Sequence, residues 1–182
     1  GTIDITSKRW GPHHGPQANI LSGNATYEFA GETYDTDHPH FTSPGSDGCV
    51  TCHMASPYGA QAGGHTMSLT YDYHGSERAN TAGCESDLCH ASMDDLNPNG
   101  FQDSIIVRIE ALRTLLINDG VIDPADPDYA LIPDVGPLTL TLVQAGALYN
   151  FQTFREDRSN GIHNPSLALD ALDASIAAMG GR

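Results

Sequence analysis

Residues 49–53 read Cys49-Val50-Thr51-Cys52-His53, and the interpretation of the whole chain begins with them. Two thiols separated by two residues, with a histidine directly after the second thiol, form the spacing that attaches a haem covalently. The thiols add to the two vinyl groups of one haem, and the histidine reaches the iron from the same side. We therefore expect Cys49 and Cys52 to form thioethers and His53 to be the proximal iron ligand.

A second motif follows at residues 84–90, Cys84-Glu85-Ser86-Asp87-Leu88-Cys89-His90. It widens the gap between the thiols to four residues and keeps the histidine directly after the second one. Cys84 and Cys89 are then the expected thioethers, and His90 is the second proximal ligand. Because the chain has only 4 cysteines, two covalently bound haem c groups are also the maximum.

Other uses of four cysteines fit the spacing less well. Disulfides would allow three pairings, and a ribbon-type zinc site expects about 15 to 20 residues between its two pairs. Here thirty-one residues separate Cys52 from Cys84. Neither a disulfide framework nor a zinc site explains why a histidine follows each pair.

Composition limits the class of protein and its partners. The 182 residues include 8 Lys and Arg against 23 Asp and Glu, a formal net charge of -15. Nucleic acid is therefore not an expected partner. No apolar run approaches the roughly 20 residues of a membrane span. The chain begins at Gly1 without an apolar signal region, so we expect an exported periplasmic or extracellular protein whose signal peptide has been removed.

The character of the sequence changes near residue 100. Residues 1–100 are rich in Gly, Pro, Ser, Thr, Asn and Asp and contain eight of the nine histidines, without sustained helical periodicity. A stretch this polar buries too little side-chain area to offset the conformational entropy that it loses on folding. Another group must then supply the core, and a haem is large and apolar enough to do so. We therefore expect one mainly α di-haem domain over 1–182, with little β. Its loop-rich, haem-packed half is 1–100 and its three-helix half is 101–182.

Three helical patterns are predicted in the second half, at about 102–118, about 138–157 and after His163. Gly120 is the expected stop of the first, and Asn164 and Pro165 are the expected N-cap and first residue of the third. Four prolines between Val121 and Pro137 predict a surface excursion without strand or helix. The expected inward residues are Ile105, Ile109, Leu112 and Leu116 in the first helix, Leu140, Val143, Ala147, Leu148, Phe151 and Phe154 in the second, and Leu169, Leu172, Ile176 and Met179 in the third.

Each iron then needs a sixth ligand or an open face. Imidazole is abundant, whereas Met54 and Met93 lie too close to the proximal histidines, Met179 fits a helix stripe, and Met67 stays open as a ligand. We therefore favour two histidine ligands for both haems. The remaining histidines are His13, His14, His38, His40, His65, His74 and His163.

Four motifs together resemble a known family. They are residues 11–17 (GPHHGPQ), 49–54 (CVTCHM), 63–66 (GGHT) and 161–165 (GIHNP), and they span nearly the whole chain. In this order they are similar to the C-terminal part of the pentahaem cytochrome c nitrite reductases and their multihaem relatives. The resemblance implies that His163 is the distal ligand of the His53 haem. It implies His40 as the distal ligand of the His90 haem, with His38 as the second candidate.

The chain departs from that family at its other histidines. In the family, His65 and one of His13 or His14 would ligate haems attached further upstream, and this chain has no upstream attachment motif. Three roles then stay open for these histidines. They no longer bind a metal and are held by hydrogen bonds, they bind one of the two haems of this chain in a changed ligand pattern, or they bind a haem of a neighbouring subunit. His74 has no motif support and is expected on the surface.

The coordination predicts the function. With both irons closed by imidazole, substrate has no place to bind, so we expect an electron carrier and not an enzyme. We favour a homopolymeric extracellular filament, a nanowire whose stacked haems conduct. The alternatives are a soluble periplasmic shuttle and, behind it, a small haem enzyme of nitrogen-oxide metabolism. Expected partners are redox proteins or mineral and electrode-like acceptors. Residues 24–26 also form a weak glycosylation sequon at Asn24.

Overall fold

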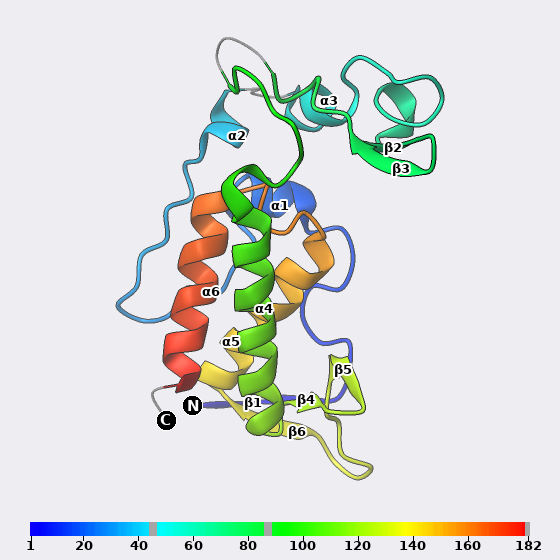
Figure 1. The fold of residues 1–182 in the computed structure, drawn as a ribbon. Helices are drawn as coiled ribbons and strands as arrows, with labels where there is room; N and C mark the ends of the chain where they lie inside the picture. Colours follow the sequence, from blue (N-terminus) through cyan, green and yellow to red (C-terminus); the bar gives the residue numbers. More distant parts are fainter. Residues whose placement is uncertain (44–46, 86–88, 181–182) are drawn as a thin grey trace. The chain divides into compact units, whose positions relative to one another are not determined.

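The computed structural model describes residues 1–43, 47–85 and 89–180, and the chain divides into two units (Figure 1). Residues 1–38 and 102–182 form the first, called the helical unit here. Residues 39–101 form the second, which contains all four cysteines and is called the cysteine unit. The sequence grouped residues 1–38 with the loop-rich half, whereas the structure joins them to the long helices.

The expected fold class, mainly α with a haem-packed N-terminal half and little β, was wrong. The chain is mixed α/β: its described residues form three two-stranded antiparallel sheets beside the helices. Residues 1–38 bury apolar side chains such as Ile5, Ile20 and Phe29 by protein packing. A haem is therefore not needed to give this segment a core.

The N-terminal strand β1 (Thr2–Ile5) pairs with β6 (Leu138–Thr141). Both alternate apolar and polar residues, and Ile5 and Leu140 are each 1% exposed. The second predicted helix therefore began too early, because residues 138–141 are strand. Helix α5 (Leu142–Asp157) starts where Thr141 forms a capping box with Gln144, a T-x-x-Q signal present in the sequence.

The proline-rich linker was also predicted wrongly. It contains a small hairpin of β4 (Ile122–Asp123) and β5 (Asp126–Ala130). Proline is tolerated at strand ends and edges, so four prolines do not exclude so short a ladder. Val121 and Ile122 are fully buried, and this anchors the hairpin to the core.

Helix α4 (Phe101–Asn118) confirms the first predicted helix. Its buried residues are the four on the predicted stripe: Ile105, Ile109, Leu112 and Leu116. Gly120 has a φ of +68°, and its N–H donates to the carbonyl of Ile117, so the chain leaves the helix through the left-handed turn that glycine favours.

Helix α6 (Pro165–Gly180) confirms the third predicted helix and its cap. The Asn164 carboxamide oxygen accepts a hydrogen bond from the Leu167 N–H at 3.2 Å. The predicted stripe was partly wrong, since Leu169 and Ile176 are only half-buried. The buried positions are Leu167, Ala168, Ala171, Leu172, Ser175 and Met179, because α6 turns its small residues toward α5.

The other elements are short. The helical unit also has α1 (Gln17–Leu21), which is the first element after β1 in the described chain. The hairpin of the cysteine unit turns at His74 and Gly75, with φ of +54° and +82°. The elements of this unit are α2 (Pro39–Thr42), α3 (Gly48–His53), η2 (Gly64–Thr66), β2 (Thr70–Tyr73), β3 (Ser76–Ala79) and η3 (Pro98–Gly100).

The two units differ sharply in their apolar cores. Within the described parts of 39–101, Ala62 is the one buried hydrophobic residue, whereas the helical unit buries all the others, Phe151 and Phe154 among them. Phe41 and Val50 of the cysteine unit are 40% and 52% exposed. Nor is any helix of the described chain long and apolar enough to span a membrane.

Tyr34 provides a test of packing in the helical unit. Its side chain is buried, and burial is the main cause that raises the pKa of its phenol. The hydrogen bond from the Phe29 N–H lowers this pKa, and the negative charges of Glu32, Glu28 and Asp170 raise it. The pKa of Tyr34 is thus higher in the folded than in the unfolded chain, where it is about 10. The stability that the neutral phenol contributes is therefore fully present below pH 10 and is lost as the pH rises through the folded-state pKa.

We predict that Tyr34→Phe loses less unfolding free energy than the wild type between about pH 9 and pH 11. Urea unfolding at several pH values measures this. Tyr73→Phe, at a half-exposed tyrosine of the other unit, is the control and should follow the wild type. Parallel pH profiles for wild type and Tyr34→Phe would contradict the prediction.

Candidate functional site

Both cysteine motifs lie in the cysteine unit. Helix α3 contains the whole first motif, so Cys49 and Cys52, three residues apart, share one face of the helix. The second motif lies in a loop that closes on itself, because the His90 N–H donates to the carbonyl of Cys84 at 3.2 Å. Residues 86–88, the last three of its four-residue gap, lie outside the described residues. The four cysteines, all among the described residues, form no disulfide.

A backbone contact at Gly83 brings the two motifs together. A Cβ atom on Gly83 would lie 2.4 Å from the carbonyl oxygen of Cys52 and 2.7 Å from that of Thr51. No side chain fits at such distances, so only glycine allows the second loop to pack directly on the last turn of α3. The attachment sites are therefore neighbours within one unit.

Two of the thiols are shielded from solvent. Burial raises the pKa of Cys52, and the nearby thiols of Cys89 and Cys49 raise it further. Burial also raises the pKa of Cys84, with smaller contributions from Cys52, Glu85 and Cys89. Cys49 and Cys89 are exposed, so each motif has one shielded and one accessible sulfur.

His53 is held by its Nδ1 atom. That nitrogen lies 2.8 Å from the main-chain carbonyl oxygen of Met67. A carbonyl oxygen accepts, so Nδ1 donates this hydrogen bond, and Nε2 is the nitrogen that would bind a metal. Histidines that bind metals use their second nitrogen in this way. The contact is made by the backbone of Met67, whose sulfur the sequence left open as an iron ligand.

His40 of α2 lies beside His90, with ring centres 6.3 Å apart and planes at 64°. Metal–imidazole bonds are about 2 Å long, so two imidazoles on opposite sides of one iron place their ring centres roughly 6 Å apart. The observed spacing therefore suits a shared iron. His38, the second candidate, is half-buried at the end of the first segment of the helical unit.

Glu85 organises the second loop. Its carboxylate accepts hydrogen bonds from the Thr81 hydroxyl at 2.8 Å and from the Met93 N–H at 3.1 Å. These bonds lower its pKa, the Thr81 bond most. Thr81 precedes the loop and Met93 follows it, so Glu85 links the two ends. The sequence held no signal for this role.

The remaining histidines of the cysteine unit are on its surface. His65 lies on η2 and is exposed. His74 is exposed at the tip of the β2–β3 hairpin, where its ring packs edge-on against Tyr73. No described contact brings either ring to a cysteine motif.

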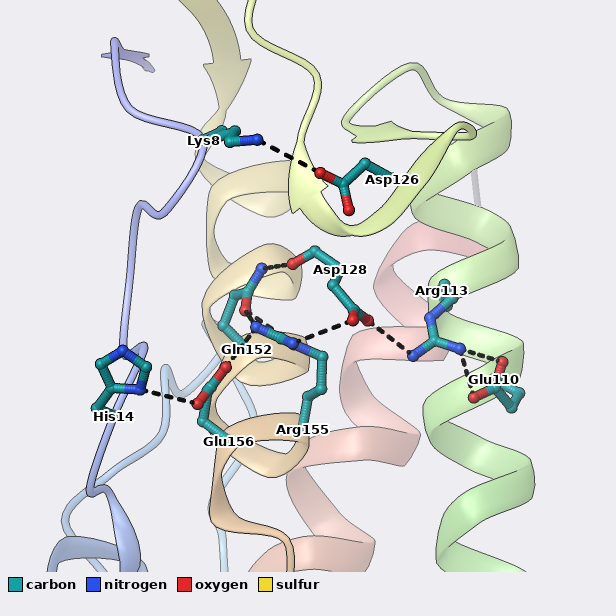
Figure 2. A network of polar contacts seen from close by, with 9 residues as sticks. All are labelled: Lys8, His14, Glu110, Arg113, Asp126, Asp128, Gln152, Arg155 and Glu156. Atoms are coloured by element: carbon teal, nitrogen blue, oxygen red, sulfur yellow. Dashed lines mark hydrogen bonds and ion pairs between the residues drawn. The ribbon is translucent and has the colours of Figure 1, made fainter.

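In the helical unit, His13 and His14 are exposed and their ring centres lie 5.0 Å apart. Figure 2 shows His14 at one end of a chain of polar contacts, with its Nδ1 3.5 Å from Glu156. Glu156 in turn contacts Arg155 at 2.5 Å. From Arg155 the contacts continue through Asp128, Arg113 and Glu110.

His163 lies in the loop between α5 and α6. Its Nδ1 is 2.5 Å from Oδ1 of Asp157, whose side chain is 0% exposed. A carboxylate oxygen accepts, so Nδ1 of His163 donates this hydrogen bond. His53 and His163 are thus both held through Nδ1. Sequence reasoning missed Asp157, because no motif marks an aspartate six residues before a histidine.

Among the described residues, no group of three or more His, Cys, Asp and Glu side chains could hold one metal ion. A haem iron takes one or two protein ligands, so the pair is the relevant arrangement. No family model, curated protein or solved structure matches the chain.

We predict that Gly83→Ala destabilises the protein by about 1–3 kcal/mol, the usual cost of forcing extra atoms into a tight contact. The new methyl group would meet backbone oxygens, which cannot rotate away. Urea unfolding measures the change. Gly180→Ala is the matched control, because nothing lies within 4 Å of its added Cβ. Equal midpoints for the two variants would show that the Gly83 contact does not constrain the motifs.

Proposed function

We propose that this chain is an electron-transfer protein with two covalently bound haem c groups, and not an enzyme. The observation on which the proposal rests is the His40–His90 pair, 6.3 Å apart within the unit that contains both cysteine motifs. One member directly follows a cysteine pair and the other lies in a separate helix, α2. In the proposed site His90 is the proximal ligand and His40 the distal ligand of one iron.

The residues have the following proposed roles. Cys49 and Cys52 attach the first haem, and His53 binds its iron. Cys84 and Cys89 attach the second, and His90 and His40 bind its iron from opposite faces. His163 is the proposed distal ligand of the first haem, and His38, His65, His13 and His14 remain secondary candidates. When bound, haem supplies a one-electron Fe(III)/Fe(II) couple.

The weak core of the cysteine unit supports a large apolar cofactor. A folded segment with one buried hydrophobic residue among its described positions does not offset the entropy of ordering some sixty residues. Val50, between the two cysteines of α3, and Phe41, beside His40, are both exposed. Two porphyrin faces would cover such side chains.

The charge of the chain suits an electron carrier with basic partners. The formal net charge of -15 steers encounters toward positive patches on redox proteins. Negative charge near an iron also stabilises Fe(III) over Fe(II), because the oxidised ion has the greater positive charge. We therefore propose low reduction potentials.

We predict that the chain, exported in a host with the c-type maturation system, contains two haems that remain attached under denaturing conditions. Cys49→Ser/Cys52→Ser and Cys84→Ser/Cys89→Ser should each retain one. Intact mass and the pyridine haemochrome spectrum give the haem number. A wild-type protein without covalent haem would overturn the proposed function.

Removing His40 tests the distal ligand. We predict that His40→Ala leaves both haems attached and opens one sixth position, so that carbon monoxide binds one reduced haem of the two. The wild type should bind none, because both irons are closed. The control is His74→Asn, at the exposed hairpin tip, where asparagine tolerates the positive φ. Carbon monoxide binding that is unchanged in His40→Ala would rule out His40 as a ligand.

The purified protein also allows a test between the two proposed kinds of electron carrier, the filament and the soluble shuttle. A filament requires a head-to-tail interface that does not close. Negative-stain microscopy of the purified protein would show filaments in that case. Small uniform particles at every concentration would instead establish a soluble shuttle.

A further inference from the structure

Residues 24–26, Asn24-Ala25-Thr26, form an N-x-T triplet that the proposed electron transfer does not use. Such a triplet is the acceptor sequence for N-linked glycans, which are attached to surface loops of exported proteins. Asn24 lies in the loop directly after α1, and it is exposed. Gly23 precedes it with a φ of +76°, so the chain turns out of the helix immediately before the triplet.

The backbone around the triplet is fixed on α5. Ala25, the middle residue, is 4% exposed, and its carbonyl oxygen accepts from the Thr153 hydroxyl at 3.1 Å. The Tyr27 N–H donates to the carboxamide oxygen of Asn150 at 2.7 Å. Both partners are buried residues of α5. The fold therefore buries the middle of the triplet and leaves Asn24 in solvent.

The hydrogen bonds of the Asn24 side chain are compatible with a glycan on its nitrogen. Its Nδ2 donates to the carbonyl oxygen of Ser22 at 2.9 Å and to the Ser22 hydroxyl at 3.2 Å. A carboxamide nitrogen has two hydrogens. After a glycan replaces one of them, the other still donates to the Ser22 carbonyl oxygen. The local turn therefore survives the modification.

We infer that Asn24 is an N-glycosylation site, which receives an oligosaccharide from a lipid-linked diphosphate donor. In this transfer Nδ2 forms a bond to the anomeric carbon of the first sugar and gives up one proton to a base of the transferring enzyme. The bond from that carbon to the diphosphate oxygen breaks, and the lipid diphosphate leaves with the electron pair. The inference goes beyond the proposed electron transfer and shares with it only the export of the chain.

A second triplet in the chain shows what the sequence and the fold exclude. Residues 164–166 (NPS) also place a serine two positions after an asparagine, but the proline between them bars transfer. Asn164 is 0% exposed, and its carboxamide is engaged at both ends: the oxygen with Leu167 and the nitrogen with the Thr36 carbonyl at 3.3 Å. Asn24 and Asn164 thus differ in exposure as well as in sequence, and both differences assign the modification to Asn24.

Export of the full chain by a host that attaches N-linked glycans to such triplets tests the inference. We expect the intact mass of the exported protein to exceed that of the polypeptide, with or without haem, by a whole number of sugar residues. An amidase that releases N-linked glycans should remove this excess and leave an aspartate in place of Asn24, which peptide mapping identifies.

Four substitutions identify the acceptor. Asn24→Gln and Thr26→Ala should each lose the whole excess mass, because each destroys the triplet. Thr26→Ser keeps the hydroxyl and should retain the glycan. Asn19→Gln is the matched control: it makes the same change at an exposed asparagine of α1 that belongs to no triplet, so it should also retain the glycan.

An exported wild-type chain without the excess mass, or an excess that persists in Asn24→Gln, would overturn the inference and leave the proposed function intact. Urea unfolding gives a second measurement, in which the glycosylated chain should have the same midpoint as Asn24→Gln. A lower midpoint would show that the turn does not accommodate a glycan and would also overturn the inference. The absence of covalent haem after expression with the c-type maturation system would overturn the proposed function alone.

Discussion

The helical unit depends on the buried polar side of α5. Three of its side chains are at most 2% exposed: Asn150, Thr153 and Asp157. Each forms hydrogen bonds with a segment distant in sequence or with the loop that follows the helix. Asn150 exchanges two hydrogen bonds with the backbone of Tyr27, and Thr153 donates to the carbonyl of Ala25. Buried polar groups must find such partners, so the helix fixes where these segments pack. The loop that contains His163 is positioned by the same requirement.

The cysteine unit is organised by different means. It has almost no apolar core among its described residues, and its order comes from backbone contacts and short loops. Gly83 packs on the carbonyl of Cys52, and Glu85 links the two ends of the second loop. A unit built in this way leaves apolar side chains such as Phe41 and Val50 exposed. The haems that we propose would cover them.

The helices of the second half could be predicted because their signals are local. The stripe of α4, the Gly120 stop and the Asn164 cap follow from periodicity and capping chemistry. The strands were missed although Thr2–Ile5 and Leu138–Thr141 alternate, because a four-residue strand is stable only once its partner, far along the chain, is in place. The linker hairpin was missed because its prolines predict a segment without strands, although proline is tolerated at strand ends and edges.

The sequence alone determined which residues can do the chemistry: the two cysteine motifs, their following histidines, and the surplus of imidazole. Covalent attachment depends on spacing along the chain, and spacing is a property of the sequence. Only the tertiary structure decided that His40 lies beside His90, that Nδ1 of His53 contacts Met67 and Nδ1 of His163 contacts Asp157, and that Gly83 brings the motifs together. These are contacts between segments, and no local pattern encodes the energy of a contact made across the fold.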